Sequence, residues 1–230
     1  NNSVRIKRSE LDTYIELAKN PEVIRNMLIA PADTVNAFYA PNFNNITILA
    51  GIINAPVYDR TKSYAANLGA IGMVVGHEIG HGFDNSGSQY DEVGRKLNWW
   101  SDEDAAKYQE KVDAFEEYYK RFDIVDGVVQ DSSITIGENM ADFAGMQCVM
   151  DILAGDKEAQ KEALESYAAI WARLGTVDYI TDSMFLNDVH SSNNVRVDAV
   201  VASLNEFYDL YDVKEGDAMY VAPEDRLNLW

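Results

Sequence analysis

The chain has 230 residues, of which 47% are hydrophobic, so it can bury a sizeable core as one domain or as one compact lobe of something larger. Its 38 acidic residues outnumber its 19 basic residues and give a formal net charge of -19. This balance argues against nucleic acid or an anionic membrane surface as a partner, and we interpret the acidity as a solvated surface.

The first elements that the sequence predicts are helical. Ser9 can cap a helix that runs towards Lys19 and stops at Asn20-Pro21, and a second short helix follows Pro21. We assign residues 1–30 to this helical segment. No internal repeat or convincing linker follows, so we expect the whole chain to form one domain.

A β-hairpin is predicted next. Thr34 to Ala40 and Ile46 to Leu49 read as strands, and the turn-forming residues 41–45 separate them. An extended peptide substrate could add its backbone along the exposed edge of such a strand. A purely structural hairpin fits the pattern equally well.

Lys62 to Gly82 reads as a long helix that carries His77, Glu78 and His81. Residues four apart lie one turn apart on the same helix face, so the two imidazoles can bind one metal ion while Glu78 projects beside them. A catalytic zinc site takes three protein ligands and leaves the fourth position to water. Because this pattern also occurs on helices without a metal, a third ligand is needed to support the prediction.

Glycines surround this histidine motif at Gly76, Gly80 and Gly82. Each glycine costs a helix about 1 kcal/mol relative to alanine. We therefore expect another backbone or side chain to approach this helix closely.

A further helix begins at Ser101, which can form a capping box with Asp104. Gly127-Val128-Val129 is a candidate short strand after this helix. The helix has a stripe of apolar residues that we assign to the core: Ala105, Tyr108, Val112, Phe115, Tyr119 and Phe122.

Glu138 and Asp142 lie four residues apart on another predicted helix. Such a pair is usually a solvated helix face, but this segment is apolar nearly all round and is expected to be buried. A buried carboxylate is costly unless a metal or a histidine pairs with it. Glu138 is therefore the candidate third ligand, Asp142 could orient His77, and Asp84 could orient His81.

The Glu138 helix is expected to end near Gly155, and further helices fit residues 157–174 and 195–211. Cys148, the single cysteine, lies in an apolar helix and is interpreted as a small buried residue. No intrachain disulfide can form, which fits a reducing cytoplasm, although exported bacterial proteins also often lack cysteine. No apolar run reaches about 18 residues, and no signal peptide precedes Ser9.

The chain has three histidines, and all of them belong to the candidate site: His77, His81 and His190. Ordinary surface or core histidines would not gather in this way. Taken alone, His190 could be a capping or packing residue after Asp188, and Arg196 could be a solvated charge at the start of a helix.

Four motifs follow one another along the chain: Asn36-Ala37-Phe38-Tyr39, then Val75-Gly76-His77-Glu78-Ile79-Gly80-His81-Gly82-Phe83-Asp84, then Gly137-Glu138-Asn139-Met140-Ala141-Asp142, then Asp188-Val189-His190-Ser191 followed by Arg196. In order and spacing they resemble the neprilysin family of zinc endopeptidases. That family also includes endothelin-converting enzyme and the bacterial oligopeptidase O. The resemblance runs from about Asn36 to the terminus and is far more specific than the histidine motif alone.

The resemblance implies a role for each matching residue. It gives the zinc ligands as His77, His81 and Glu138, the general base as Glu78, and the residues that orient the ligands as Asp142 and Asp84. It also implies that His190 donates to the oxyanion of the transition state and that Arg196 grips the substrate backbone. Asn36 and Ala37 match the pair that pins the peptide alongside the cleft.

A specificity pocket is implied as well. Val74 falls where the family lines the pocket for the side chain just after the scissile bond, and Ile52 and Trp171 are further candidates for this pocket. The expected fold is α+β and mostly helical: a thermolysin-like (gluzincin) zinc peptidase lobe, with the metal between two helices and a small hairpin or sheet at the cleft. One Zn²⁺ is expected per chain.

The function implied is zinc-dependent hydrolysis of internal bonds in short peptides, with an apolar residue preferred after the cut. The alternative is a zinc-binding but non-catalytic fragment or binding module. Complete family members are much longer, and their N-terminal portion contributes a lid. We therefore expect residues 1–230 to be the C-terminal catalytic portion of a metallopeptidase, with residues 31–230 as its zinc-binding core.

The expected partners are a peptide substrate and this missing N-terminal lid portion. Neither nucleic acid nor a membrane is expected to contact this segment. The expected compartment is the cytoplasm of a bacterium, with an extracellular or cell-surface location as the alternative because the N-terminal portion is absent.

Overall fold

The computed structural model describes residues 30–182 and 186–229, together with the single positions 8, 11, 12, 15 and 19. The helices predicted from Ser9 towards Lys19 and after Pro21 fall in the stretch where only those single positions are described, so they remain predictions.

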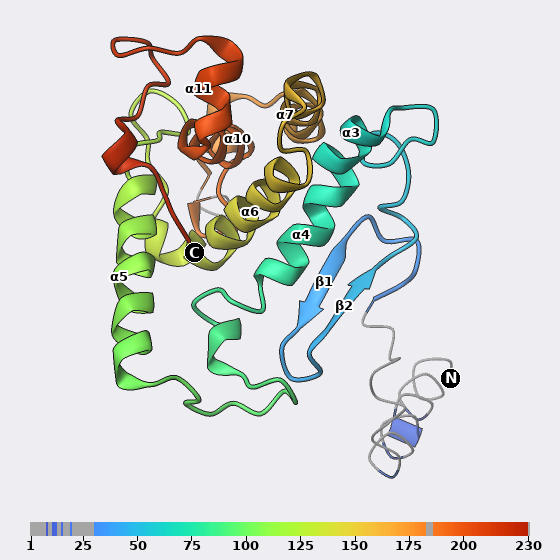
Figure 1. Ribbon diagram of the computed structural model, residues 1–230. Coiled ribbons are helices and arrows are strands. Elements are labelled where there is room, and N and C mark those ends of the chain that lie inside the picture. Colours follow the sequence, from blue (N-terminus) through green and yellow to red (C-terminus); the bar gives the residue numbers. More distant parts are fainter. Residues whose placement is uncertain are drawn as a thin grey trace.

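The described chain is mostly helical and contains one two-stranded sheet, which confirms the predicted fold class (Figure 1). Its strands are β1 (Ala37–Ala40) and β2 (Asn45–Ile48), and its longer helices are α4 (Met73–Gly80), α5 (Asp102–Tyr119), α6 (Ser132–Ile152), α7 (Lys157–Trp171), α10 (Asn193–Ser203) and α11 (Asn205–Tyr211). The short helical segments are α3 (Tyr64–Asn67), η1 (Leu68–Gly72), η2 (Gly87–Gln89), α8 (Val177–Ile180) and η3 (Pro223–Asp225).

The predicted hairpin is present. β1 and β2 pair antiparallel, with Ala37 opposite Ile48 and Ala40 opposite Asn45. Asn44 has a φ of 46° at the turn, in the left-handed region that asparagine tolerates. β1 contacts α4, so one strand of the hairpin lies beside the helix that carries the histidine motif (Figure 1).

The long helix predicted over residues 62–82 changes its winding part-way. Ser63 caps α3 by accepting a hydrogen bond from the Ala66 N–H, and the five residues of η1 then form a π-helical turn before α4 begins. α3 and η1 pack against α7, whereas α4 packs mainly against α6. The π-helical turn therefore lies where the helix passes from one neighbour to the other.

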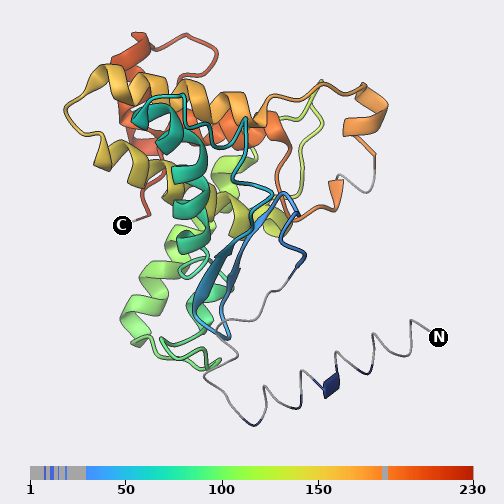
Figure 2. The same ribbon diagram turned by 90° about the vertical axis from the view of Figure 1, so that its right-hand side faces the viewer.

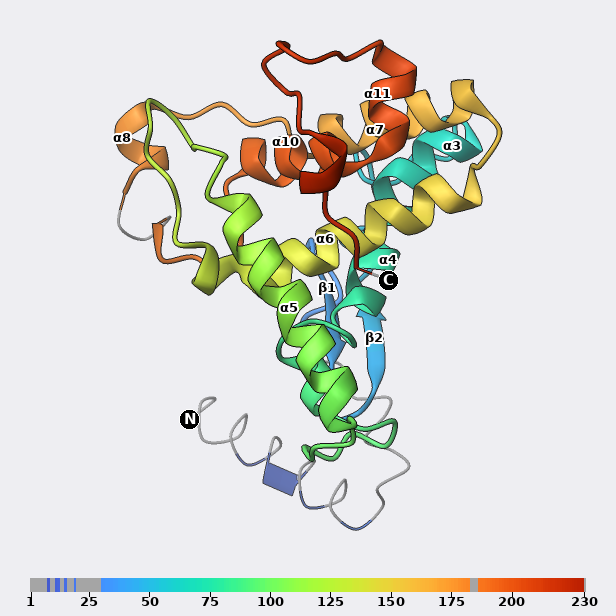
Figure 3. The same cartoon turned by 60° about the vertical axis from the view of Figure 1, so that its left-hand side comes forward.

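α6 is the central helix. It contacts α4, α5, α7 and α10, and most of its side chains are buried, as its apolar sequence predicts. α10 and α11 lie on the side of α6 opposite to the hairpin (Figures 2 and 3). The core around α6 includes Phe115, Phe143, Met146, Tyr167 and Leu204, each at most 2% exposed.

Three predicted helix and strand assignments were wrong in detail. The helix predicted over residues 195–211 is interrupted at Leu204, whose ψ of 126° is extended, so α10 and α11 are separate. The helix predicted over residues 157–174 ends at Trp171, because Ala172 is also extended with a ψ of 120°. Val128 forms only an isolated bridge with Val125, not a strand.

The prediction that Cys148 is buried was also wrong, because its side chain is exposed. It lies on the part of α6 where the nearby Ile152 is 60% exposed too. An apolar sequence on all sides of a helix therefore did not mean burial on all sides.

Among the helices of the described ranges, none combines the length and the apolar character that crossing a bilayer requires.

Candidate active site

The backbones of α4 and α6 touch where the helices cross. A Cβ atom built on Gly76 would lie 2.9 Å from the Gly145 Cα, and one built on Gly145 would lie 2.7 Å from the Met73 carbonyl oxygen. A Cβ atom built on Gly80 would lie 3.1 Å from the Ala141 Cα. The close approach predicted from the glycines is confirmed, and it allows side chains of moderate length from both helices to meet.

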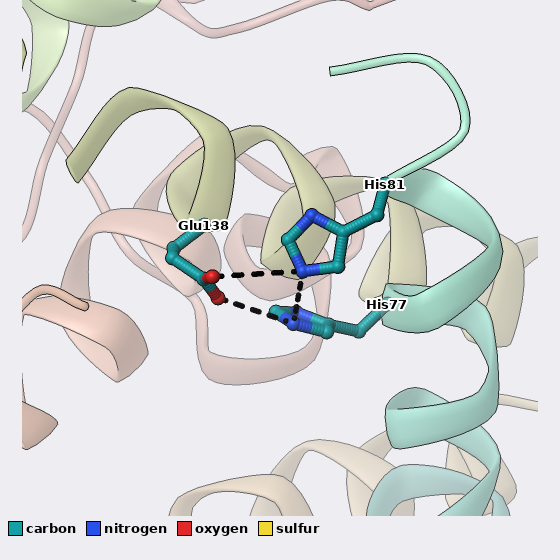
Figure 4. A group of neighbouring side chains, drawn as sticks. All are labelled: His77, His81 and Glu138. Carbon is teal, nitrogen blue, oxygen red and sulfur yellow. Dashed lines mark hydrogen bonds and ion pairs between the residues drawn. The ribbon is translucent and has the colours of Figure 1, made fainter. Parts of the chain in front are cut away.

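His77, His81 and Glu138 meet in the space beside this crossing (Figure 4). His77 Nε2 lies 3.0 Å from His81 Nε2 and 3.3 Å from Glu138 Oε2, and His81 Nε2 lies 3.6 Å from Glu138 Oε1. Ligand atoms at about 2.0–2.1 Å from a tetrahedral zinc ion are roughly 3.3 Å apart. The three groups are therefore spaced as ligands of one such ion.

The other nitrogen of each imidazole is bound to a carboxylate. His77 Nδ1 lies 2.7 Å from Asp142 Oδ1, and His81 Nδ1 lies 2.6 Å from Asp84 Oδ2. Asp84 is itself fixed by the turn after α4, where its Oδ1 accepts hydrogen bonds from the backbone N–H groups of Ser86 and Gly87 at 2.7 and 2.6 Å. These contacts leave both Nε2 atoms directed at the shared space.

The electrostatics of this cluster fit a cation. Burial disfavours a charged imidazole, but hydrogen bonds to Asp84 and Glu138 raise the pKa of His81 to about 10, and Asp142 and Glu138 likewise raise the pKa of His77. Glu138 Oε2 is buried and makes no hydrogen bond of good geometry with a described residue, although His77 Nε2 and His190 Nε2 each lie 3.3 Å from it. A buried oxygen without a well-aligned donor and two nitrogens held in a negative field are groups that a divalent cation would satisfy.

Glu78 lies beside the ligands without being one of them. Glu78 is only 5% exposed, and it lines the same cavity as the two imidazoles. Burial raises the pKa of Glu78, and the negative charge of Glu138 adds to this effect. A carboxylate with a raised pKa in a cavity is suited to accept and return a proton.

His190 reaches the cluster from the loop before α10. Its Nε2 lies 3.3 Å from Glu138 Oε2, and Asp188 Oδ1 lies 2.8 Å from its Nδ1. Asp188 Oδ1 also accepts a hydrogen bond from the His190 backbone N–H at 2.8 Å. The loop thus presents one edge of the imidazole to the space between the two helices.

Arg196 lies behind the ligands and is only 6% exposed. Its Nε and Nη2 donate to the two carboxylate oxygens of Asp142, both at 2.6 Å, and its guanidinium stacks 3.9 Å from the centre of the Trp171 ring. The residue predicted to grip the substrate therefore also holds the carboxylate that orients His77. Nη1 is the donor that this ion pair does not use.

A cavity of about 420 Å³ opens in front of the cluster. It brings together the three candidate ligands, Glu78 and His190 with every residue that was predicted to bind substrate: Asn36, Ala37, Ile52, Val74, Trp171 and Arg196. Asp142 lies behind the wall and is 0% exposed.

Further residues of this site were not predicted. Phe38, Tyr39 and Met73 line the cavity but had been assigned no role. Their place in the hairpin and in the helix turn before His77 was a usable signal. Asp188 could have been recognised from its position two residues before His190, where an aspartate commonly accepts a backbone hydrogen bond.

Comparison with known proteins identifies the family. Residues 36–227 match the family described as Peptidase family M13. The neutral endopeptidase of Lactobacillus helveticus is 37% identical over 213 residues, which cover 90% of this chain and 32% of that protein.

Two solved structures are similar in fold. PepO from Lactobacillus rhamnosis superposes with a TM-score of 0.84 at 35% identity, over 90% of this chain and 33% of that one. The zinc metalloprotease Zmp1 of Mycobacterium tuberculosis, solved with an inhibitor, gives a TM-score of 0.83 at 31% identity, over 90% and 34% of the two chains. The chain thus spans about a third of the length of these proteins. Because the match includes both helices that meet at the histidines, the chain belongs to peptidase family M13, the family of neprilysin, endothelin-converting enzyme and oligopeptidase O.

Proposed function

We propose that this chain is the C-terminal catalytic portion of a zinc endopeptidase, with residues 31–230 as its core, and that it hydrolyses internal bonds of short peptides. The observation that carries the proposal is the convergence of His77, His81 and Glu138 on one point, with Glu78 beside them in the same cavity. One zinc ion held by these three residues would supply Lewis acidity and lower the pKa of a water molecule to about 7.

The other catalytic roles would belong to residues of this chain. Glu78 would take the proton from the attacking water and later deliver it to the amine that leaves. His190, with one proton on Nδ1 towards Asp188 and a second on Nε2, would donate from Nε2 to the oxygen that becomes negative when water adds to the peptide carbonyl. Removing one such donor typically lowers turnover by roughly 10²–10³. Asp188 would keep the imidazole in the orientation that this donation needs.

Substrate binding would use the opposite walls of the cavity. Asn36 precedes β1 and Ala37 begins it, and both line the cavity, which supports the proposal that they pin an extended peptide backbone alongside the cleft. Arg196 would offer Nη1 to a substrate carbonyl while its other donors hold Asp142. Val74 and Ile52 are apolar wall residues, which supports a preference for an apolar side chain after the cut.

The test uses Glu78→Gln, which keeps the size of the side chain and removes its capacity as a base. We expect the purified chain to retain about one zinc per molecule in both forms, and the variant to lose activity on a fluorogenic peptide. Glu103→Gln is the matched control, because Glu103 is exposed and pairs only with Lys107 among the contacts found for it. Equal activity of the wild type and Glu78→Gln would refute the assignment of the base.

A second candidate function follows from the length of the chain. Since the chain spans about a third of its relatives, it could bind zinc and still need the missing portion to cleave peptides. Metal analysis and a cleavage assay, run with and without that portion added as a separate polypeptide, distinguish the two. Zinc binding with activity only after addition would favour this candidate.

We further propose the bacterial cytoplasm as the compartment. The single cysteine supports it, since a chain that needs no intrachain disulfide suits a reducing environment. Fractionation of the native cells with an antibody against this chain tests it, and recovery from the cell surface or medium would contradict it.

A further inference from the structure

The loop that carries His190 is held by a side chain from a distant part of the sequence. Gln130 precedes α6 and is only 8% exposed. Its Nε2 donates to the Asp188 carbonyl at 3.3 Å and to the His190 carbonyl at 2.9 Å, and its Oε1 accepts from the Ser192 N–H at 3.1 Å. One amide side chain therefore binds the backbone on both sides of His190 and at His190 itself.

Apolar packing contributes little to holding the tip of this loop, Val189 and His190, in place. The His190 side chain is 47% exposed, and the neighbouring Val189 is 52% exposed. The imidazole itself contacts Asp188 and Glu138, both by polar groups. Its position relative to Glu138 is consequently set by where hydrogen bonds hold the backbone of residues 188–190.

A second contact ties the same loop to α6. Ser191 Oγ donates to Asn139 Oδ1 at 2.7 Å, and Asn139 follows Glu138 directly in the sequence. Asn139 is in turn held by Thr135, whose Oγ1 accepts from its Nδ2 at 2.9 Å. Residues 130–139, which include the third candidate ligand, thus supply two side chains that anchor the His190 loop.

We propose that Gln130 is a positioning residue for His190. It fixes the loop backbone so that the imidazole edge faces the reacting carbonyl, and this role rests on the proposed function in which His190 donates to the oxyanion. The chemistry requires a neutral amide, since only an amide donates to two carbonyls and accepts from one N–H at the same time. Methionine has a similar size and none of these groups, and glutamate lacks the two donors.

The first experiment compares Gln130→Met with Gln160→Met in the zinc-loaded chain. Gln160 is a suitable control because it is 7% exposed and also donates to a backbone carbonyl, that of Met150. A misplaced transition-state donor lowers kcat and leaves KM nearly unchanged, so we expect Gln130→Met to lower kcat by about 10–100-fold. Gln130→Glu should resemble Gln130→Met, and Gln160→Met should keep kcat within about twofold of the wild type.

A double-mutant cycle separates positioning from general damage. In a His190→Ala background there is no imidazole to place, so Gln130→Met should cost less than about twofold in kcat. An equal loss of kcat in the two backgrounds, or the same loss in Gln160→Met, would overturn the proposal.

A readout without catalysis completes the test. The chain has three histidines, so the Cε1–H signals can be assigned by NMR from the His190→Ala spectrum. Gln130→Met and Gln130→Glu should shift or broaden the His190 signal and leave those of His77 and His81 in place, which also shows that the variants fold. An unchanged His190 signal would refute the placement by Gln130. If the zinc-loaded wild type cleaves no peptide, the proposed function has failed, and the spectral comparison then decides only whether Gln130 places the His190 side chain.

Discussion

Asp142 holds two side chains at once in a fully buried position. It bonds to His77 at 2.7 Å and forms a bidentate ion pair with Arg196. Burial opposes its ionisation, but Arg196 and His77 outweigh this effect and hold the pKa of Asp142 below its ordinary value. Loss of this charge would leave Arg196 as a buried cation without a partner, which typically costs about 3–5 kcal/mol.

The pH dependence of stability should report this pair. A carboxyl whose pKa is lower in the folded than in the unfolded state stabilises the fold above its unfolded pKa of about 4, and the stabilisation is lost as pH falls through the folded value. In the metal-free chain, we therefore expect the difference in unfolding free energy between wild type and Asp142→Asn to be large near neutral pH and to shrink in acid. Urea unfolding with a chelator measures it. A difference that does not depend on pH would contradict the pairing.

Zinc affinity should depend on the same carboxylate. Asp142→Ala removes the group that fixes the His77 ring, so we expect zinc binding to weaken by roughly 10–100-fold. Asp151→Ala is the control, because Asp151 lies on the same helix, is exposed and accepts only from Gln147 among the contacts found for it. Competition with a chromophoric chelator gives both affinities, and equal values would count against the role of Asp142.

For individual site residues, the sequence revealed those that belong to a short local pattern. It did not reveal which residues distant in the sequence would contact them in the fold. His77 and His81 were predictable because the helix period fixes which residues share a face. Gln130 was not, because nothing in the neighbourhood of a glutamine indicates which backbone, about 60 residues further on, its amide will bind. The dual use of Arg196 was missed for the same reason, since its partner lies on another helix.

The crossing of α4 and α6 is the element that places the ligands. Gly145→Ala would put a methyl group 2.7 Å from the Met73 carbonyl oxygen and force the helices apart. We expect it to lower the unfolding free energy by about 1–3 kcal/mol and to weaken zinc binding. Gly72→Ala is the control, because its Cβ would meet the flexible Leu68 side chain at 2.9 Å. Denaturant titration and chelator competition test both, and equal behaviour of the two variants would refute the account.

Elements were predicted best where a local signal marks both ends. The hairpin has turn residues between its strands, and α5 begins where Ser101 Oγ accepts from the Asp104 N–H at 3.1 Å, as the capping pattern indicates. The interruption at Leu204 had no such signal, because this residue is apolar and 0% exposed and continues the helical pattern. The π-helical turn was equally hidden, because Gly69 and Gly72 weaken a helix without indicating a change of winding.

The whole molecule carries a net charge of -19, and its charges repel one another in the compact state. Added salt screens this repulsion over a Debye length that falls from about 30 Å at 0.01 M to about 10 Å at 0.1 M. We expect the urea midpoint of the metal-free chain to rise between these concentrations of sodium chloride, with an unchanged m-value. A fall of the midpoint would indicate that attractive surface pairs outweigh the net repulsion.

The change of winding in η1 gives the fold a local tolerance to deletion. Each residue of a regular helix advances the facing direction by about 100°. A π-helical turn closes its hydrogen bond over one more residue than an α-helical turn, so it covers about the same rotation with one residue more. Removing one residue of η1, such as Ala70, would let the turn relax to an ordinary helix while α4 keeps its orientation relative to α3 and α7. Removing one residue of α4 ahead of His77, such as Val75, would instead turn the histidine face by about 100° away from Glu138.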